Sequence, residues 1–183
     1  MRVVHLVDEV RERTERVVIL RLPWLLLGLL GGMTATVMIS RFETVLTNNI
    51  HLAFFVPIIV YMSDAVGTQT ETMYVRSLAR EKVDFFNYLK KELLSGIFLG
   101  LLMGGLIGGA TWLWLRLPET AVTVGLAMMI NVTLAPVVAM GVSELLRKSR
   151  VDPALGAGPF ATVIQDFISL LIYFVVASVI MLI

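Results

Sequence analysis

Five long stretches of this chain carry almost no charged side chains, and they constrain its fold more than any other feature. A helix that crosses a lipid bilayer needs about 20 mainly apolar residues. Stretches of that kind lie at residues 22–40, 50–66, 93–115, 120–143 and 159–183, with one aspartate in the second and one in the last. Hydrophobic residues make up 57% of the chain and charged residues 16%, against about 25% charged in soluble domains. We therefore predict an all-α integral membrane protein with five transmembrane helices per protomer.

The basic residues alternate between the predicted loops and indicate an orientation. Thirteen of the fifteen Lys and Arg residues precede the first span or lie between spans two and three or spans four and five. Only Arg41 and Arg116 lie in the alternate loops. Because cytoplasmic loops carry an excess of Lys and Arg, we expect a cytoplasmic N-terminus, an outside C-terminus and a multi-pass location in the plasma (inner) membrane.

The first 20 residues differ in character from the rest of the chain. Acidic residues occur where a signal peptide would have an apolar core. Two stabilising pairs of opposite charge lie four residues apart, Glu9 with Arg13 and Glu12 with Arg16. We predict an amphipathic cytoplasmic helix at residues 1–20, either a topogenic anchor or a gate, ahead of a transmembrane domain at residues 21–183.

The side-chain inventory excludes several kinds of chemistry. The chain has no cysteine, and its two histidines, His5 and His51, lie far apart. It contains no HExxH pattern, no Ser/His/Asp constellation and no GxxxxGK[ST] loop. We therefore expect neither an enzyme nor a nucleic-acid partner. Carboxylate, amide, hydroxyl and carbonyl oxygens remain, and these suit Mg²⁺, Ca²⁺ or Mn²⁺.

Asp166 is the clearest functional candidate, because it lies inside the last apolar stretch. A charge at the centre of a membrane helix costs about 2.5–3.5 kcal/mol on insertion scales. Thr162 and Ser169 share its helical face, and Gln165 is adjacent. One alternative is a buried aspartate bonded to a neighbouring helix. Since the spans contain no Lys or Arg that would neutralise Asp166, we favour a mobile cation as its partner.

A second group of candidates follows Pro57. Asp64, Thr68 and Glu71 fall on one helical face if the second helix continues past Gly67. Pro57 and Gly67 both permit a local opening that would free carbonyl oxygens for a cation. Glu71 is closer to the predicted cytoplasmic end, where solvated or paired charges are common, so Asp64 is the stronger candidate of the two.

Two further features are best explained by helix packing. Gly96, Gly100, Gly104 and Gly108 recur every four residues in the third span. Such a stripe lets another helix backbone approach closely, and we prefer this interpretation to pore lining. Asn131 in the fourth span is expected to bond across helices rather than to line a cavity.

Three segments resemble the membrane domain of the MgtE-type magnesium channels. They are RLPW at residues 21–24, LAFFVP at 52–57 and DPALGAGPFATVIQDFISLLIYF at 152–174. The resemblance covers roughly residues 21–183. It implies five helices per protomer, a homodimer and a Mg²⁺ pore on the dimer axis, with Asp166 at the position of the family's pore aspartate.

The chain also departs from that family's pattern. Members usually read close to GTGGNAGNQSAT where residues 61–72 read YMSDAVGTQTET. Gly67 and Gln69 match, whereas Asp64 and Glu71 introduce carboxylates. The family's cytoplasmic N-terminal and CBS domains, which sense magnesium, have no counterpart in these 183 residues, so we expect a separate regulatory subunit in their place.

These observations together predict a divalent cation channel or transporter embedded in the lipid bilayer. We expect partly hydrated Mg²⁺, with Mn²⁺, Ca²⁺ and Co²⁺ as alternatives, to pass paired Asp166 carboxylates along a homodimer axis. The predicted metal ligands are Asp166, Asp64, Thr162, Gly67 and Thr68, and the further pathway residues are Glu71, Gln69 and Ser169.

Two other functions stay open at this point. The first is a proton- or cation-coupled divalent metal carrier or exporter of the same fold, in which Asp64 or Glu71 takes up protons. The second is a non-conducting membrane subunit that recruits a partner through its glycine-rich face and its basic loops.

Overall fold

The computed structural model describes residues 13–80, 83–148 and 153–181. Within these ranges all regular secondary structure is helical. The helices are α1 (Thr14–Ser40), α2 (Glu43–Asn48), α3 (His51–Arg80), α4 (Phe85–Leu115), α5 (Pro118–Lys148) and α6 (Pro153–Met181). The all-α prediction is therefore confirmed for the described part of the chain.

Four segments among the described residues are long and apolar enough to cross a membrane. They are α3, α4, α5 and the part of α6 that covers Phe160–Met181. α1 contributes a shorter apolar segment, Leu25–Ser40. The prediction of apolar spanning helices is confirmed for these four, whereas the fifth span, the sidedness of the termini and the dimer pore stay predictions.

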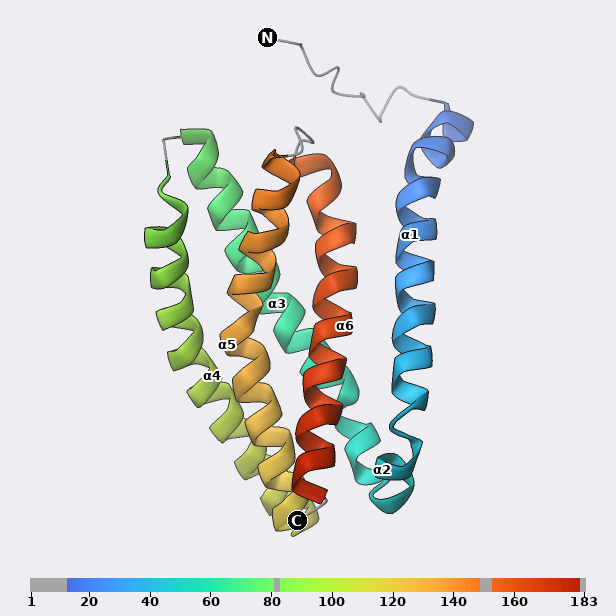
Figure 1. The fold of residues 1–183 in the computed structure, drawn as a ribbon, viewed down its shortest axis with the longest axis vertical. Coiled ribbons are helices and arrows are strands. Elements are labelled where there is room, and N and C mark those ends of the chain that lie inside the picture. Colours follow the sequence, from blue (N-terminus) through green and yellow to red (C-terminus); the bar gives the residue numbers. More distant parts are fainter. Residues whose placement is uncertain (1–12, 81–82, 149–152, 182–183) are drawn as a thin grey trace.

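α5 lies at the centre of the molecule, and the other long helices surround it unevenly. It packs against α3, α4 and α6, and its most extensive interface is with α4. α1 packs mainly against α6 and stands to one side of the other long helices (Figure 1). The short helix α2 lies at the end of the molecule where α6 ends (Figure 1). α6 is thus the helix that joins α1 to the rest.

The apolar core lies where α3, α5 and α6 meet. Fully buried side chains of α5 pack here against Leu52 and Ile59 of α3 and Phe174 of α6. The buried Tyr173 hydroxyl donates a hydrogen bond to the Leu52 carbonyl oxygen at 2.7 Å. This bond satisfies the one polar group of a large core side chain, and the core fixes α6 relative to α3.

The glycine stripe of α4 packs closely against another helix, as predicted, and that helix is α5. Gly96, Gly100 and Gly104 are buried. A Cβ atom on Gly100 would lie 2.6 Å from the Met129 carbonyl oxygen, and one on Gly104 would lie 2.6 Å from the Gly125 carbonyl oxygen. Only residues without side chains allow the two backbones to come this close.

Some local expectations differ from the structure. α3 runs without interruption through Pro57 and Gly67, so the expected local opening is not present. Residues 1–12 of the predicted amphipathic helix lie outside the described residues, while Thr14 onward belongs to α1, which continues past residue 20 without a break. α2 was not predicted, because its sequence ETVLTN has no distinctive apolar period.

Candidate cation site

Asp166 faces a cavity between α6, α1 and α3. The cavity has a volume of about 230 Å³. A water molecule takes up about 30 Å³ in the liquid, so the space admits a cation together with several waters. Besides Asp166 it is lined by Gly28, Gly31, Gly32, Ala35, Thr36, Ile39, Val60, Val163 and Leu170.

Small residues of α1 create the open space in front of Asp166. Nothing lies within 4 Å of the position that a Cβ atom would take on Gly28 or Gly32. Gly31, by contrast, lies directly against the Val163 side chain of α6. The α1 glycines therefore have two roles, because Gly31 allows α1 to dock on α6 while Gly28 and Gly32 leave room beside the carboxylate.

Among the described residues, no side chain neutralises the Asp166 carboxylate. It is half-buried, and no described Lys or Arg forms an ion pair with it. It makes no hydrogen bond to a neighbouring helix among the described residues, which disfavours the alternative of a purely structural aspartate. The negative charge of Asp64 on α3 repels the Asp166 carboxylate. A bound cation would neutralise the Asp166 carboxylate and reduce its repulsion from Asp64.

A second, much smaller cavity lies between α3 and α6. Its volume is about 10 Å³. Asp64, Gly67, Thr68 and Glu71 line it from α3, Thr162 and Gln165 from α6, with Ala161 and Ala139 completing the wall. Because α3 continues past Gly67, its polar residues share one face, as the sequence predicted.

Gln165 lines this small cavity and carries a buried oxygen without a hydrogen-bond partner among the described residues. Its side chain is only 4% exposed. The Gln165 Nε2 donates a hydrogen bond to Ser63 Oγ at 2.5 Å, while the buried Oε1 has no hydrogen-bond partner in the described part of the chain. A Cβ atom on Gly67 would lie 3.3 Å from that Oε1. In the sequence Gln165 stands out only as a neighbour of Asp166, although an amide in an apolar span is itself a signal of a polar environment.

Two predicted pathway residues lie outside both cavities. Gln69 is exposed on α3. Ser169 is buried, and its Oγ donates to the Gln165 carbonyl oxygen at 2.7 Å. The Ser169 carbonyl oxygen accepts from Asn131 Nδ2 of α5 at 3.3 Å, which confirms the expected cross-helix bond of Asn131. In this conformation Ser169 therefore belongs to the α5–α6 packing.

One protomer does not gather a full set of charged ligands. No three acidic or histidine side chains among the described residues come close enough together to hold a metal ion. Asp166 lines one cavity and Asp64 with Glu71 the other. A cation here would depend on neutral oxygens, on waters, or on a second protomer.

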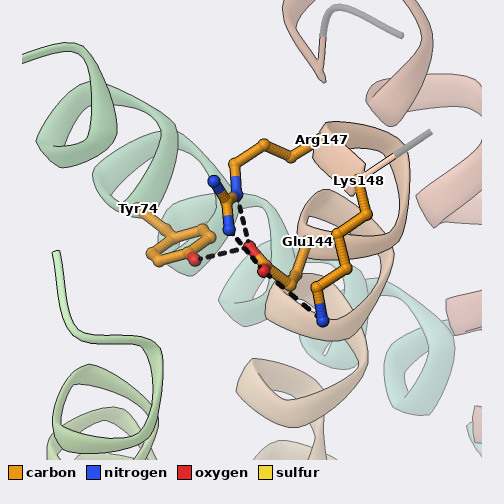
Figure 2. Close-up of polar contacts among 4 residues, drawn as sticks. All are labelled: Tyr74, Glu144, Arg147 and Lys148. Carbon is orange, nitrogen blue, oxygen red and sulfur yellow. Dashed lines mark hydrogen bonds and ion pairs between the residues drawn. The ribbon is translucent and has the colours of Figure 1, made fainter. Parts of the chain in front are cut away.

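A buried carboxylate that the sequence analysis missed ties α3 to α5. Glu144 is only 8% exposed, and Figure 2 shows Tyr74, Arg147 and Lys148 around its carboxylate. Tyr74 Oη donates to Glu144 Oε2 at 3.1 Å. Arg147 binds both carboxylate oxygens, at 2.7 Å and 2.6 Å, and Lys148 Nζ lies 3.7 Å from Oε1. The two basic side chains more than balance the charge of Glu144, so the cluster anchors α3 rather than offering a cation site.

A further bond fixes α3 to α4 on the adjacent turn. Thr70 Oγ1 donates a hydrogen bond to Glu92 Oε2 at 3.1 Å. Thr70 and Tyr74 lie one helical turn apart and are both buried. These two contacts hold the segment of α3 that directly follows the small cavity, so they restrict how far Glu71 can move.

Comparison with known proteins identifies the relatives of the chain. A family model named MgtE, described as a divalent cation transporter, matches residues 56–176. A magnesium transporter MgtE of Enterococcus faecalis is 32% identical over 178 residues, which is 96% of this chain. The namesake protein of Bacillus subtilis is 31% identical over 86% of the chain, and that of Thermus thermophilus is 32% identical over 88%.

The chain matches only part of each relative. The matched region amounts to 39% of the Enterococcus faecalis protein and to 36% of each of the other two. The family match covers α3 from Val56 and α6 as far as residue 176, so it includes every residue that lines the small cavity. In the larger cavity it includes Asp166 and the other α3 and α6 residues, whereas the α1 wall precedes the match.

Proposed function

Because this chain belongs to the MgtE family of divalent cation transporters, we propose that it carries Mg²⁺ across the plasma (inner) membrane. The family is one of transporters and not of enzymes. Three relatives bear the name magnesium transporter, so Mg²⁺ is the first ion to test, with Mn²⁺, Ca²⁺ and Co²⁺ as alternatives.

One observation carries this proposal. Asp166 lies within the candidate span Phe160–Met181, faces a cavity of about 230 Å³ and has no basic partner among the described residues. An unpaired carboxylate at membrane depth is unfavourable unless a mobile ion or water compensates it. Mg²⁺ gives up its water reluctantly, and this cavity has room for a partly hydrated ion.

We further propose that two protomers form the pore. Two Asp166 carboxylates, one from each protomer, would face each other across a homodimer axis and balance the charge of one Mg²⁺. The polar residues of α3 and α6 would then continue the pathway. In this proposal Asp64, Thr68, Gly67 and Thr162 contact the ion, and Glu71, Gln69 and Ser169 serve the path beyond.

The membrane potential supplies enough driving force for uptake. Moving one elementary charge across 100 mV changes its energy by about 2.3 kcal/mol, so a divalent ion that crosses the full field gains about 4.6 kcal/mol per 100 mV. Inward flux therefore needs no nucleotide site, and the chain has no phosphate-binding loop.

Flux through reconstituted protein tests the proposal. Uptake of Mg²⁺, Mn²⁺, Ca²⁺ and Co²⁺ into liposomes would be compared for the wild type and Asp166→Asn. We expect the amide variant to lose divalent cation uptake, because a neutral side chain no longer balances the ion's charge. Cross-linking would show whether the dimer is retained.

Glu119→Gln is a matched control for this experiment. Glu119 is exposed in the first turn of α5, so its neutralisation should leave uptake unchanged. Normal uptake by a folded Asp166→Asn protein would contradict the role of Asp166. Absence of uptake of all four ions by the wild type would favour the non-conducting subunit instead.

A coupled carrier is the second candidate, and one observation favours it. Asp64 repels Glu71 electrostatically on the same face of α3, and closely spaced carboxylates are a common means of binding protons. In that case Mg²⁺ flux should change when a proton gradient is imposed at constant membrane potential. Flux that follows only the potential and the Mg²⁺ gradient would exclude this mechanism.

A further inference from the structure

We infer that each protomer holds a second divalent-cation site in the small cavity between α3 and α6. Its ligands are the carboxylates of Asp64 and Glu71 and the amide oxygen Oε1 of Gln165. The site deepens the proposed function, since it adds a binding position for the same class of ion. The inference rests on the proposed function only for the class of ion that binds. The site itself requires neither Asp166 nor a dimer.

The buried oxygen of Gln165 points to a missing ligand. Gln165 is only 4% exposed, and its Oε1 has no hydrogen-bond partner among the residues that the structure describes. A buried acceptor without a partner is unfavourable and calls for an explanation. The Nε2 of the same amide is held by Ser63 Oγ, which turns Oε1 toward Gly67 and so toward the cavity wall that Gly67 forms.

Gly67 lies close to this oxygen and between Asp64 and Glu71 along α3. Asp64 lies three residues before Gly67 and Glu71 four residues after it, so all three share one face of α3. Helix side chains tilt toward the N-terminus of their helix, which directs the longer Glu71 side chain back toward Gly67. Asp64, Glu71 and Gln165 line the same small cavity.

The charge of the cavity matches a divalent cation. Asp64 and Glu71 repel each other, and no described Lys or Arg forms an ion pair with either. The other lining groups are neutral: Thr68 on α3, Thr162, Ala161 and Gln165 on α6, and Ala139 on α5. Two negative charges with hard oxygen ligands suit a divalent ion of the Mg²⁺, Mn²⁺ and Ca²⁺ group.

The size of the cavity separates this site from the space at Asp166. A volume of about 10 Å³ admits about one water-sized particle, whereas the cavity at Asp166 measures about 230 Å³. An ion in the small cavity must exchange part of its water shell for protein oxygens. Because Mg²⁺ dehydrates reluctantly, we expect Mn²⁺ to bind here more tightly than Mg²⁺.

Counting bound Mn²⁺ tests the inference. Electron paramagnetic resonance would measure free Mn²⁺ during titration of the purified full chain in detergent, with Asp166→Asn as the background that removes the pore carboxylate. We expect one Mn²⁺ per protomer to remain bound. Adding Glu71→Gln should weaken this binding by more than about tenfold, the lower range for losing even a supporting group of a metal site.

Two further variants make the result specific. In the same background, Gly67→Ala would place a Cβ atom 3.3 Å from Gln165 Oε1 and should weaken Mn²⁺ binding by displacing that oxygen. Glu43→Gln, an exposed acidic residue of α2, should leave binding unchanged. Thermal unfolding of each variant would show that the fold is retained.

Each outcome decides the question. An Asp166→Asn protein that binds no Mn²⁺, or one whose binding is indifferent to both Glu71→Gln and Gly67→Ala, would overturn the second site. Because binding is measured without flux, loss of transport in the liposome experiment would leave this inference intact. Conversely, if the wild type transports normally but the Asp166→Asn protein binds no Mn²⁺, the second site is overturned and the proposed function stands.

Discussion

Asp166 and Gln165 are adjacent in the chain, yet they line different cavities. Successive residues of an α-helix point about 100° apart, so Asp166 faces the cavity beside α1 while Gln165 faces α3. Thr162 shares a predicted stripe with Asp166 but lines the small cavity, and Ser169 lies in the α5–α6 packing. At the scale of single residues, the neighbouring helix decides which polar groups meet.

Glu144 illustrates the same point for a residue that the sequence analysis passed over. It follows the fourth apolar stretch directly and precedes Arg147 and Lys148, so its position resembles that of an ordinary solvated charge at a helix end. In the structure Tyr74 of α3 covers it and donates a hydrogen bond. The sequence separation between Tyr74 and Glu144 concealed this contact.

Removing the Tyr74 hydroxyl should weaken the α3–α5 contact. Tyr74→Phe keeps the buried ring but deletes the donor to Glu144, and hydrogen bonds to charged groups contribute about 1.5–3 kcal/mol. We expect the unfolding temperature of the purified protein in detergent to fall. Tyr61→Phe is the matched control, because Tyr61 is 69% exposed; equal unfolding temperatures for the two variants would contradict the proposed anchor.

At the scale of helices, α4 shows how far a pattern can be interpreted. The repeat of glycines every four residues predicted close packing, and the stripe is indeed buried against α5. The sequence did not indicate which helix would be the partner. Gly105 and Gly109 adjoin the stripe, but nothing lies within 4 Å of the Cβ position of either, because they point away from α5.

This difference between glycines gives a paired stability test. Gly100→Ala would bring a Cβ atom within 2.6 Å of the Met129 carbonyl oxygen, so α5 must shift. We expect a loss of about 1–3 kcal/mol in the free energy of unfolding, the usual range for overpacking. Denaturation in mixed micelles would measure it.

Gly105→Ala is the control for the packing test. Its Cβ atom would enter open space, so we expect unchanged or slightly higher stability, since alanine favours the helical conformation over glycine. Equal stability of the Gly100→Ala and Gly105→Ala proteins would contradict the close approach of α4 and α5.

α1 contains a proline inside the helix rather than at its start. A helix that begins at Thr14 places Pro23 inside α1, even though proline commonly opens helices. Membrane helices tolerate an internal proline when nearby groups satisfy the freed carbonyl. The docking of Gly31 on Val163 then holds α1 on α6, and α1 forms one wall of the cavity at Asp166.

At the scale of the whole molecule, the long helices run side by side, with α1 at the edge of the group (Figure 1). Many large apolar side chains of α1 and α4 are exposed in the single chain, as expected for surfaces that face lipid or a second protomer. The helices alone do not indicate how the chain is oriented in the membrane. The basic residues predict an orientation, because they concentrate at alternate helix ends.

The absence of cysteine makes the predicted orientation directly testable. Lys90→Cys would place a single exposed thiol near the start of α4, and Glu119→Cys would place one near the start of α5. Because α5 begins where α4 ends, the two thiols lie at opposite ends of this helix pair. We expect a membrane-impermeant maleimide to label Glu119→Cys in intact cells and to label Lys90→Cys only after permeabilisation. The reverse pattern would show that the chain is inserted the other way round.

Composition and the spacing of charges already indicate a helical membrane protein, locate most of its spanning helices and single out Asp166 as the carboxylate to examine. These properties follow from the solvent, because lipid demands long apolar helices and penalises every charge within them. The tertiary structure decided which residues face one another. It separated Asp166 from Thr162, brought Gln165 to Asp64 and Glu71, and paired Tyr74 with Glu144. Such contacts depend on the rotation and docking of whole helices, which side-chain packing between distant segments sets.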